Sequence, residues 1–343
     1  MRRKQFLSSI STASLLLSME PSSLVAANKN KWTVPKFLKQ GDKIGITSPA
    51  GSISIEEIQP AVLKLQEWGY TVVIGNSIGK KDNTFGGTDV QRAADMQQML
   101  DDKSIKAILC ARGGYGSVRI IDFLNFSRFK NHPKWIIGFS DVTVFINHLF
   151  AQFHCASIHS KMCNSFPSVW ENADALQKQT IESINDCLQG KALSYTTTAN
   201  SNNKVGQATG RLIGGNLRTL ENLAGTTSSP DTKNCILFIE DTGEYLYSID
   251  RMLRNLLRSG KLNKLSGLIV GGFKIKTDDE SEKFGQTLEQ IVLEITKEFD
   301  YPICFDFPVG HQKNNMALIC GAMASLVVAK QEATLSMNIT NND

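Results

Sequence analysis

The feature of this chain that most constrains its fold is an alternation of short apolar runs with amphipathic segments in its first half. Ser54 and Glu57 have the spacing of a capping box before the first amphipathic segment. Thr88 and Gln91 have the same spacing before the second. Strands that alternate with helices build parallel βαβ units, so this half is expected to be a doubly wound α/β domain. The apolar runs, which we predict to be strands, lie at 43–47, 71–74, 105–110 and 135–139.

The length of 343 residues exceeds the roughly 100–200 residues that one domain usually contains, so two domains are expected. Between the halves, a polar helix is followed by a run of threonines and asparagines that is too polar to bury. We therefore predict an N-terminal domain over 34–166, a linker region over 167–204 and a C-terminal domain over 205–340.

The second half is expected to mix helices and strands. Ser248 is expected to cap a helix, because the apolar residues that follow it recur at helical spacing. Another helix is expected over 284–299, and the final strand-like runs, 322–328 and 333–337, predict a hairpin.

The first residues differ in character from the rest of the chain. Arg2 and Arg3 precede a mostly apolar stretch at 6–19, and small residues follow up to Ala27. This pattern predicts a cleaved signal peptide over 1–27, with the adjacent arginines pointing to twin-arginine export and a periplasmic or otherwise exported protein. The apolar stretch contains serines and is shorter than the roughly 20 residues of a membrane span, which disfavours an anchor. The alternative is an uncleaved tail on a cytoplasmic protein.

Charge and cysteine content exclude some classes of protein. The net charge is only +4 and basic residues interleave with acidic ones, so a nucleic-acid partner is not expected. The number of cysteines is odd, and four of them lie in apolar runs that we predict to be strands. Free buried thiols are therefore favoured over disulfides. The seven cysteines are Cys110, Cys155, Cys163, Cys187, Cys235, Cys304 and Cys320.

Ser140 follows an apolar strand directly and opens an amphipathic run at 142–153. A serine at such a strand-to-helix turn has its hydroxyl lifted above the sheet edge, beside the N–H groups and positive dipole end of the helix. That is the arrangement of a nucleophile elbow, although Val142 stands where the usual pattern has a second glycine. The alternative is that Ser140 or Asp141 is an ordinary helix N-cap.

The segment from Arg112 to Gly116 is a second glycine-rich turn between a strand and a helix. Its glycines, Gly113 and Gly114 among them, would let backbone N–H groups approach a ligand closely. It lacks the Lys-Ser/Thr of a phosphate-binding loop, so we favour an oxyanion hole or a carboxylate-binding turn. The alternative is a tight turn that requires positive φ angles.

His311 is the best catalytic candidate among the five histidines, because it follows a strand and stands in a turn where its imidazole can face a cleft. Glu240 ends the buried run 235–239, where a carboxylate is well placed to orient an imidazole. A zinc site is a weaker alternative, because its spacing matches no known zinc pattern. Its candidate ligands would be His154, Cys155, His159 and Cys163.

Several of these segments, in their order and spacing over 34–328, resemble the LD-carboxypeptidase family of serine peptidases, which includes the microcin immunity peptidases. The residues that carry the resemblance are GDKIGITSPAG at 41–51, ARGGYG at 111–116, GFSDVT at 138–143, GGNL at 214–217, FIEDTGE at 238–244, IDRML at 249–253 and FPVGH at 307–311.

The resemblance implies a catalytic role for each site residue. Ser140 would be the nucleophile, His311 the general base and then acid, and Glu240 the carboxylate that orients the histidine. Backbone amides of Asp141 and of the turn at Gly113 and Gly114 would stabilise the oxyanion, and an acyl-enzyme would then be hydrolysed. These three amide-bearing residues are thus expected to contact the substrate.

The resemblance also implies a fold and a substrate. The fold would be a flavodoxin-like N-terminal domain plus a smaller mixed α/β C-terminal domain, with the active site in the interdomain cleft. The substrate would be murein tetrapeptide, which loses the terminal D-alanine attached to diaminopimelate. No metal or other cofactor is implied, and a homodimer is expected. The chain departs from the family where members often have His-Gly-Pro, since it has His159, Ser160 and Lys161 there.

Two other functions stay open from the sequence. One is an immunity-type amidase acting on a peptidyl nucleotide antibiotic, which would need an aromatic wall; Trp135 and Trp170 are the nearby candidates. The other is an exported two-domain ligand-binding protein, because two α/β domains around a cleft also suit ligand capture. A binding protein should ignore active-serine reagents and lose little affinity when Ser140 is replaced by alanine.

Overall fold

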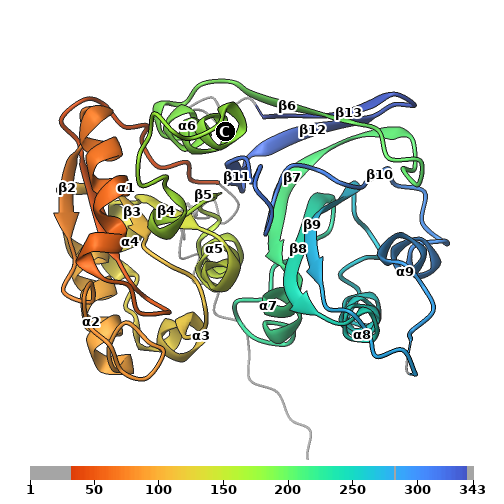
Figure 1. The fold of residues 1–343 in the computed structure, drawn as a ribbon, viewed down its shortest axis with the longest axis horizontal. Coiled ribbons are helices and arrows are strands. Elements are labelled where there is room, and N and C mark those ends of the chain that lie inside the picture. The colour runs from red at the N-terminus through yellow and green to blue at the C-terminus, as the bar shows by residue number, and fades with distance from the viewer. Residues whose placement is uncertain (1–31, 282, 338–343) are drawn as a thin grey trace, which may run out of the picture. The chain divides into compact units, whose positions relative to one another are not determined.

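The computed structural model describes residues 32–281 and 283–337. The predicted signal peptide at 1–27 lies outside the described residues, as do the last three residues of the predicted C-terminal domain. None of the helices in the described part has the length and apolar content that crossing a membrane requires. Residues 32–337 contain two β-sheets with helices packed around them (Figure 1).

The first sheet has the strand order β11-β5-β4-β3-β1-β2. Its first five strands in sequence pair in parallel, as the alternation of strand and helix predicts. Its strands are β1 (Lys43–Thr47), β2 (Thr71–Ile74), β3 (Ile105–Cys110), β4 (Trp135–Gly138), β5 (Ser157–His159) and β11 (Leu318–Cys320).

The second sheet has the order β10-β9-β8-β7-β12-β13-β6 and is mixed. Strands β7 to β10 pair in parallel, whereas β12 and β13 form the predicted antiparallel hairpin. Its strands are β6 (Leu193–Thr198), β7 (Gly206–Asn216), β8 (Cys235–Glu244), β9 (Gly267–Ile275), β10 (Ile303–Cys304), β12 (Met323–Val328) and β13 (Glu332–Met337).

The helices follow the predicted caps where these are strong. Both capping boxes, Ser54 with Glu57 and Thr88 with Gln91, are present. Two expectations were wrong: the helix predicted over 284–299 is shorter, and Ser248 lies inside a helix capped by Tyr245. The run 142–153 is helical and ends in a π-helical turn. The helices are α1 (Ile55–Glu67), α2 (Asp89–Asp101), α3 (Ser117–Ile120), α4 (Ser127–Asn131), α5 (Thr143–His148), α6 (Ala175–Gln189), α7 (Leu217–Asn222), α8 (Leu246–Arg258) and α9 (Leu288–Ile295).

The interval 167–204, which the sequence predicts to be a linker, contains regular structure. It holds α6 and then β6, the edge strand of the second sheet, which pairs with β13. Leu193 and Tyr195 are buried while Thr196 and Thr198 are exposed. The run of threonines and asparagines at 196–203 contains no buried residue, as its polarity predicts, although its first three residues belong to β6.

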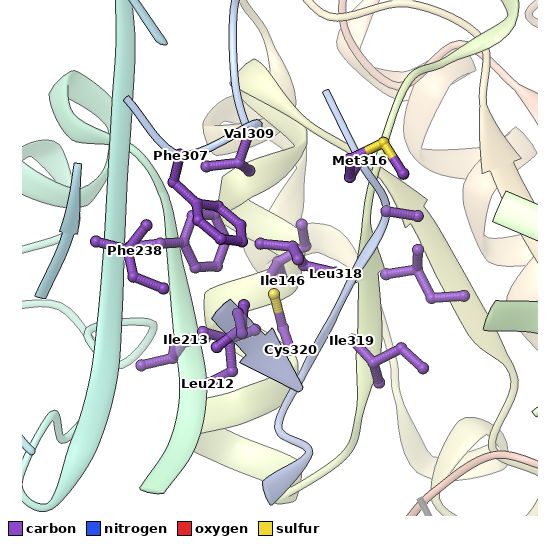
Figure 2. Close-up of a cluster of buried hydrophobic side chains, with 14 of the residues drawn as sticks. Ile146, Leu212, Ile213, Phe238, Phe307, Val309, Met316, Leu318, Ile319 and Cys320 are labelled. Carbon is purple, nitrogen blue, oxygen red and sulfur yellow. The ribbon is translucent and has the colours of Figure 1, made fainter. Parts of the chain in front are cut away.

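One apolar cluster joins the two sheets. Helix α5, from the first half of the chain, packs beside β7 and α7 of the second half (Figure 1). Figure 2 shows its Ile146 in one group with Ile213 of β7, Phe238 of β8 and Leu318 of β11. Because side chains from both sheets share this core, the strand ends that follow it are held at a fixed separation. All seven cysteines are buried and free, which confirms the prediction of free thiols.

A buried carboxylate ties three elements of the first sheet together. Asp95 of α2 is 2% exposed and accepts hydrogen bonds from Thr47 Oγ1 of β1 (2.6 Å) and from Ser77 N (3.1 Å) and Oγ (2.5 Å). Its other oxygen accepts from Asn76 N (2.7 Å). Buried donors that lose such an acceptor keep their full desolvation cost.

Asp95→Ala is therefore expected to lower the free energy of unfolding by about 3 kcal/mol. Urea denaturation followed by circular dichroism measures this change. The matched control is Asp101→Ala on the same helix, whose carboxylate is 4.0 Å from the exposed Arg128 and should change the free energy by less than about 0.5 kcal/mol. Equal effects of the two substitutions would contradict the prediction.

Candidate active site

Ser140 stands at a sharp turn between β4 and α5. Its φ angle is +60°, in the left-handed region that residues other than glycine rarely adopt, and a short 3₁₀ turn (140–142) leads from it into the helix. Such a conformation costs about 1–3 kcal/mol and persists where the surroundings enforce it, most often at functional sites. Ser140 is thus not an ordinary N-cap, because no side-chain hydrogen bond caps this turn. Its conformation is that of a nucleophile elbow.

The turn at Gly113 and Gly114 lies directly against Ser140. A Cβ placed on Gly113 would be 3.1 Å from Ser140 Cβ and 3.2 Å from Ser140 Oγ, so the close approach leaves no room for a side chain. Gly114 has φ +105°, which also requires glycine. The carbonyl of Gly113 accepts from Gly51 N (3.0 Å), which fixes the plane of the turn. The segment is thus a tight turn with a positive φ angle at Gly114, and this is compatible with the predicted role of its backbone N–H groups in binding a ligand.

Asp141 uses its side chain to brace the elbow. The carboxylate is 7% exposed and accepts a hydrogen bond from Ser117 N at the start of α3 (2.7 Å). Burial raises the pKa of Asp141, against the opposing effect of that hydrogen bond. Arg92, fully buried on α2, donates to the carbonyl of Gly116 (2.9 Å) next to the same turn. The side chains of Asp141 and Arg92 therefore hold the end of the turn at 112–116 in place beside Ser140.

His311 and Glu240 form a close pair. His311 Nδ1 lies 2.5 Å from Oε2 of Glu240, which stands in the middle of β8, and the glutamate side chain is fully buried. A Cβ on Gly310 would be 2.3 Å from Glu240 Cβ, so the residue before the histidine must be glycine for this contact. Gly310 N in turn donates to Asn315 Oδ1 (2.7 Å). A carboxylate in this position fixes the imidazole with Nε2 turned outward.

Ser140 and the His311–Glu240 pair are neighbours without a direct hydrogen bond. The ring of Phe139, the residue before the serine, has its centroid 4.9 Å from that of the His311 ring. No hydrogen bond joins Ser140 to His311 within the described residues. Ser140 lines a cavity of about 330 Å³ and His311 a second one of about 580 Å³. Catalytic hydrogen bonds are often long without substrate, so the arrangement is compatible with a triad.

The cavity at Ser140 brings in polar groups to which the sequence analysis gave no role. Arg218 on α7 forms a two-point ion pair with Glu244 at the end of β8 (3.1 and 2.7 Å). Asp241 accepts from Asn216 Nδ2 (2.7 Å) and Arg218 N (2.9 Å). Burial raises the pKa of Asp241 to about 6. The motifs at 214–217 and 238–244 contain most of these residues, but their pairing depends on the neighbouring strands β7 and β8.

The four residues weighed as zinc ligands do not form a metal site. His159 is fully buried between the rings of Phe139 and Phe238, with centroid distances of 5.8 and 4.9 Å. Burial, and then the charge of His311, lower its pKa to about 3, so His159 is neutral. In the part of the chain that the structure describes, no group of three His, Cys, Asp or Glu side chains is placed to hold a metal ion.

The sequence matches two family models in the same order as the two sheets. The LD-carboxypeptidase N-terminal domain matches residues 44–160, and the LD-carboxypeptidase C-terminal domain matches 209–326. The chain belongs to the LD-carboxypeptidase family. Ser140 lies within the first matched domain, and Glu240 and His311 lie within the second.

Relatives within the LD-carboxypeptidase family cover nearly the whole chain. The probable murein peptide carboxypeptidase of Bacillus subtilis is 31% identical over 308 residues, which are 89% of this chain and 95% of the relative. The microcin C7 self-immunity protein of Escherichia coli is 26% identical over 320 residues, 84% of this chain and 91% of the relative. The crystal structure of muramoyltetrapeptide carboxypeptidase from Oxalobacter formigenes has a TM-score of 0.77 and 27% identity, covering 87% of this chain and 99% of that one. The two-domain α/β fold is thus that of known family members.

Proposed function

We propose that this protein is a serine-type LD-carboxypeptidase that releases terminal D-alanine from murein tetrapeptide by cleaving its bond to the L-centre of diaminopimelate. The proposal rests on the conformation of Ser140, whose φ angle is +60° and which lies against Gly113. The ring of Phe139, the residue before it, packs on the ring of His311, which is paired with Glu240. The names of the relatives from Bacillus subtilis and Oxalobacter formigenes support the class of substrate.

In the proposed reaction, His311 Nε2 takes the proton of the Ser140 hydroxyl as the oxygen attacks the carbonyl of diaminopimelate. Glu240 holds Nδ1 and stabilises the imidazolium that forms. Backbone N–H groups of Asp141 and of Gly113 and Gly114 face the developing oxyanion. Departure of D-alanine takes the proton from His311 and leaves an ester on Ser140, which water hydrolyses with His311 again as the base.

We place this chemistry between the two halves of the described chain. The cavity that Ser140 lines is bounded by Gly114 and Tyr115 on one side and by Arg218 and Thr242 on the other. The N-terminal half is proposed to be flavodoxin-like, because its parallel strands have the order β2-β1-β3-β4-β5. The serine would then stand at the carboxyl end of β4, where doubly wound sheets bind their ligands.

The test is to incubate the purified protein with L-Ala-γ-D-Glu-meso-diaminopimelate-D-Ala and follow the products by mass spectrometry. We expect loss of one alanine and the appearance of the tripeptide. The control peptide carries L-alanine at the end and should be cleaved at least about 100-fold more slowly, because its side chain and carboxylate exchange places. Release of alanine from both peptides at equal rates would reject LD specificity, and release from neither would reject the proposed substrate.

An immunity-type amidase is the second candidate, supported by the similarity to the self-immunity protein. The aromatic wall that it needs is not supplied by the tryptophans that we considered. Trp135 is fully buried, and Trp170 lies under the ammonium of Lys64 (3.4 Å from the ring centroid). The exposed ring of Tyr115 lines the Ser140 cavity instead. A peptidyl adenylate analogue tested beside the tetrapeptide distinguishes the two candidates.

We also propose export, from the signal pattern at 1–27, and a homodimeric mature protein. An exported enzyme would trim murein peptides outside the inner membrane. Fractionation of cells that express the full chain, followed by size measurement of the mature product, tests both proposals.

A further inference from the structure

Lys161 is an unusual residue beside the candidate site. It lies two residues after the end of β5 and is half-buried. Its ammonium donates to the backbone carbonyl of Gln312, the residue after His311 (2.7 Å). The same ammonium lies 5.5 Å from the ring centroid of Phe139, the ring that also packs on His311. Lys161 therefore contacts Phe139, the residue before Ser140, and Gln312, the residue after His311.

The charge of Lys161 is not balanced by a carboxylate. In the ranges 32–281 and 283–337, neither Lys161 nor the nearby Lys274 belongs to an ion pair with an acidic side chain. Glu240 is close enough to be attracted, but His311 already engages its carboxylate. Lys274 is exposed, but Lys161 is partly withdrawn from water, and a cation in such a place is unfavourable unless an anion joins it. The other cation of the site region, Arg218, is matched by Glu244.

We propose that the ammonium of Lys161 binds the terminal carboxylate of the peptide and so makes this enzyme an exopeptidase. This inference rests on the proposed carboxypeptidase function. The carboxylate carbon of the last residue lies about 4 Å from the carbonyl carbon that Ser140 attacks, close to the spacing of consecutive Cα atoms. An anion site for it must therefore lie near both Ser140 and His311, and the ammonium of Lys161 contacts the residue next to each of them, Phe139 and Gln312.

Exopeptidase selectivity follows from this arrangement. A longer peptide, or one with an amide end, would put a neutral group against the ammonium of Lys161 and leave that charge without a partner. Such mismatches discriminate strongly, because the charged groups of the site keep their desolvation cost. The position is also one where this chain departs from the His-Gly-Pro common in the family, so the lysine would be a device particular to this chain.

The test compares tetrapeptide with a free terminal D-alanine and the same peptide ending in D-alaninamide. Lys161→Met is expected to raise KM for the free acid about 10- to 100-fold and to leave kcat for the free acid nearly unchanged. The value of kcat/KM for the amide should also change little. Lys161→Arg should restore much of the loss, because it keeps the charge. The matched control is Lys106→Met, which removes an exposed lysine of β3 whose ammonium also donates to a backbone carbonyl, that of Lys103 (3.1 Å), and should change KM less than about twofold.

The pH profile gives a second readout. Burial, and then the charge of Lys274, lower the pKa of Lys161 to about 8. Since a lysine is charged below its pKa, the preference for acid over amide should be constant below about pH 8 and fall above it. Lys161→Arg should hold the preference to higher pH. Because the same catalytic groups act on both substrates, the ratio of their rates isolates the recognition of the carboxylate, and His159 stays neutral throughout this range.

The results distinguish a Lys161 that binds the carboxylate of the substrate from one that only supports the turn at His311. An equal loss on acid and amide in Lys161→Met would mean that Lys161 only supports the His311 turn through Gln312, and would overturn the inference. An equally large rise of KM in Lys106→Met and in Lys161→Met would mean that the loss does not depend on the place of Lys161, and would overturn the inference. If the wild type releases nothing from either peptide while an uncharged fluorophosphonate still labels Ser140, the proposed substrate fails and this inference fails with it.

Discussion

Replacing Ser140 with alanine is expected to lower kcat for D-alanine release from murein tetrapeptide by at least about 10⁴-fold. The hydroxyl is the atom that would form the acyl-enzyme, and no other side chain of the elbow can take its place. Oxyanion donors and substrate contacts survive the change, so a small residual rate and a nearly unchanged KM are expected. Mass spectrometry of the products measures the rate.

A matched serine separates chemistry from folding in this experiment. Ser165 stands in a 3₁₀ turn (Cys163–Ser165) and is partly exposed, and Ser165→Ala should keep at least about half of the activity. Labelling by an uncharged fluorophosphonate should vanish in Ser140→Ala alone. Equal alanine release by wild type and Ser140→Ala would keep the activity but reject the nucleophile. Persistent labelling of Ser140→Ala would point to another reactive serine.

Local sequence patterns predicted much of the first sheet because its signals are local. The capping boxes at Ser54 and Thr88 satisfy backbone N–H groups within one turn, so a few neighbouring residues determine where α1 and α2 begin. Strand β1, before α1, is buried apart from Lys43 and reads as an apolar run, whereas β2, between the two helices, is an edge strand with exposed end residues. The same reasoning predicted the elbow at Ser140 from the order strand, turn, helix.

Elements that depend on distant partners were missed. Strand β11 has three residues and joins the first sheet by pairing antiparallel with β5, about half of the chain away. Ser248 looked like an N-cap, but its hydroxyl donates to Glu244 Oε2 (2.9 Å) and accepts from Arg218 Nη2 (2.8 Å). Tyr245 therefore occupies the cap position, and the side-chain network decides the helix boundary.

The candidate site also has some residues that local sequence could predict and some contacts that it could not. The residues themselves could suggest Ser140, His311 and Glu240 one at a time, and the family resemblance joined them into one site. The contacts of Lys161 could not be predicted, because they depend on the loop after β5 meeting the turn after His311 in space. The Arg218–Glu244 pair likewise requires β7 and β8 to end side by side.

Replacing Glu240 with glutamine is expected to lower kcat about 10⁴-fold with little change in KM. The buried carboxylate accepts the Nδ1 proton of His311 at 2.5 Å, which leaves Nε2 unprotonated and able to act as a base. A glutamine amide that donates to Nδ1 would favour the opposite tautomer, with the proton on Nε2. It would also remove the negative charge that stabilises the imidazolium when Ser140 is deprotonated.

Steady-state kinetics on the tetrapeptide, with thermal unfolding of the same samples, test this prediction. The glutamine has the size of the glutamate, so the melting temperature should stay within a few degrees of the wild type, which would assign the loss to chemistry. The control is Glu294→Gln on α9, an exposed partner of Arg254, which should leave kcat unchanged. If Glu240→Gln kept wild-type kcat, His311 would need another orienting group, and none of the other carboxylates in the described residues contacts its ring. Such a result would therefore reject His311 as the base together with Glu240 as its partner.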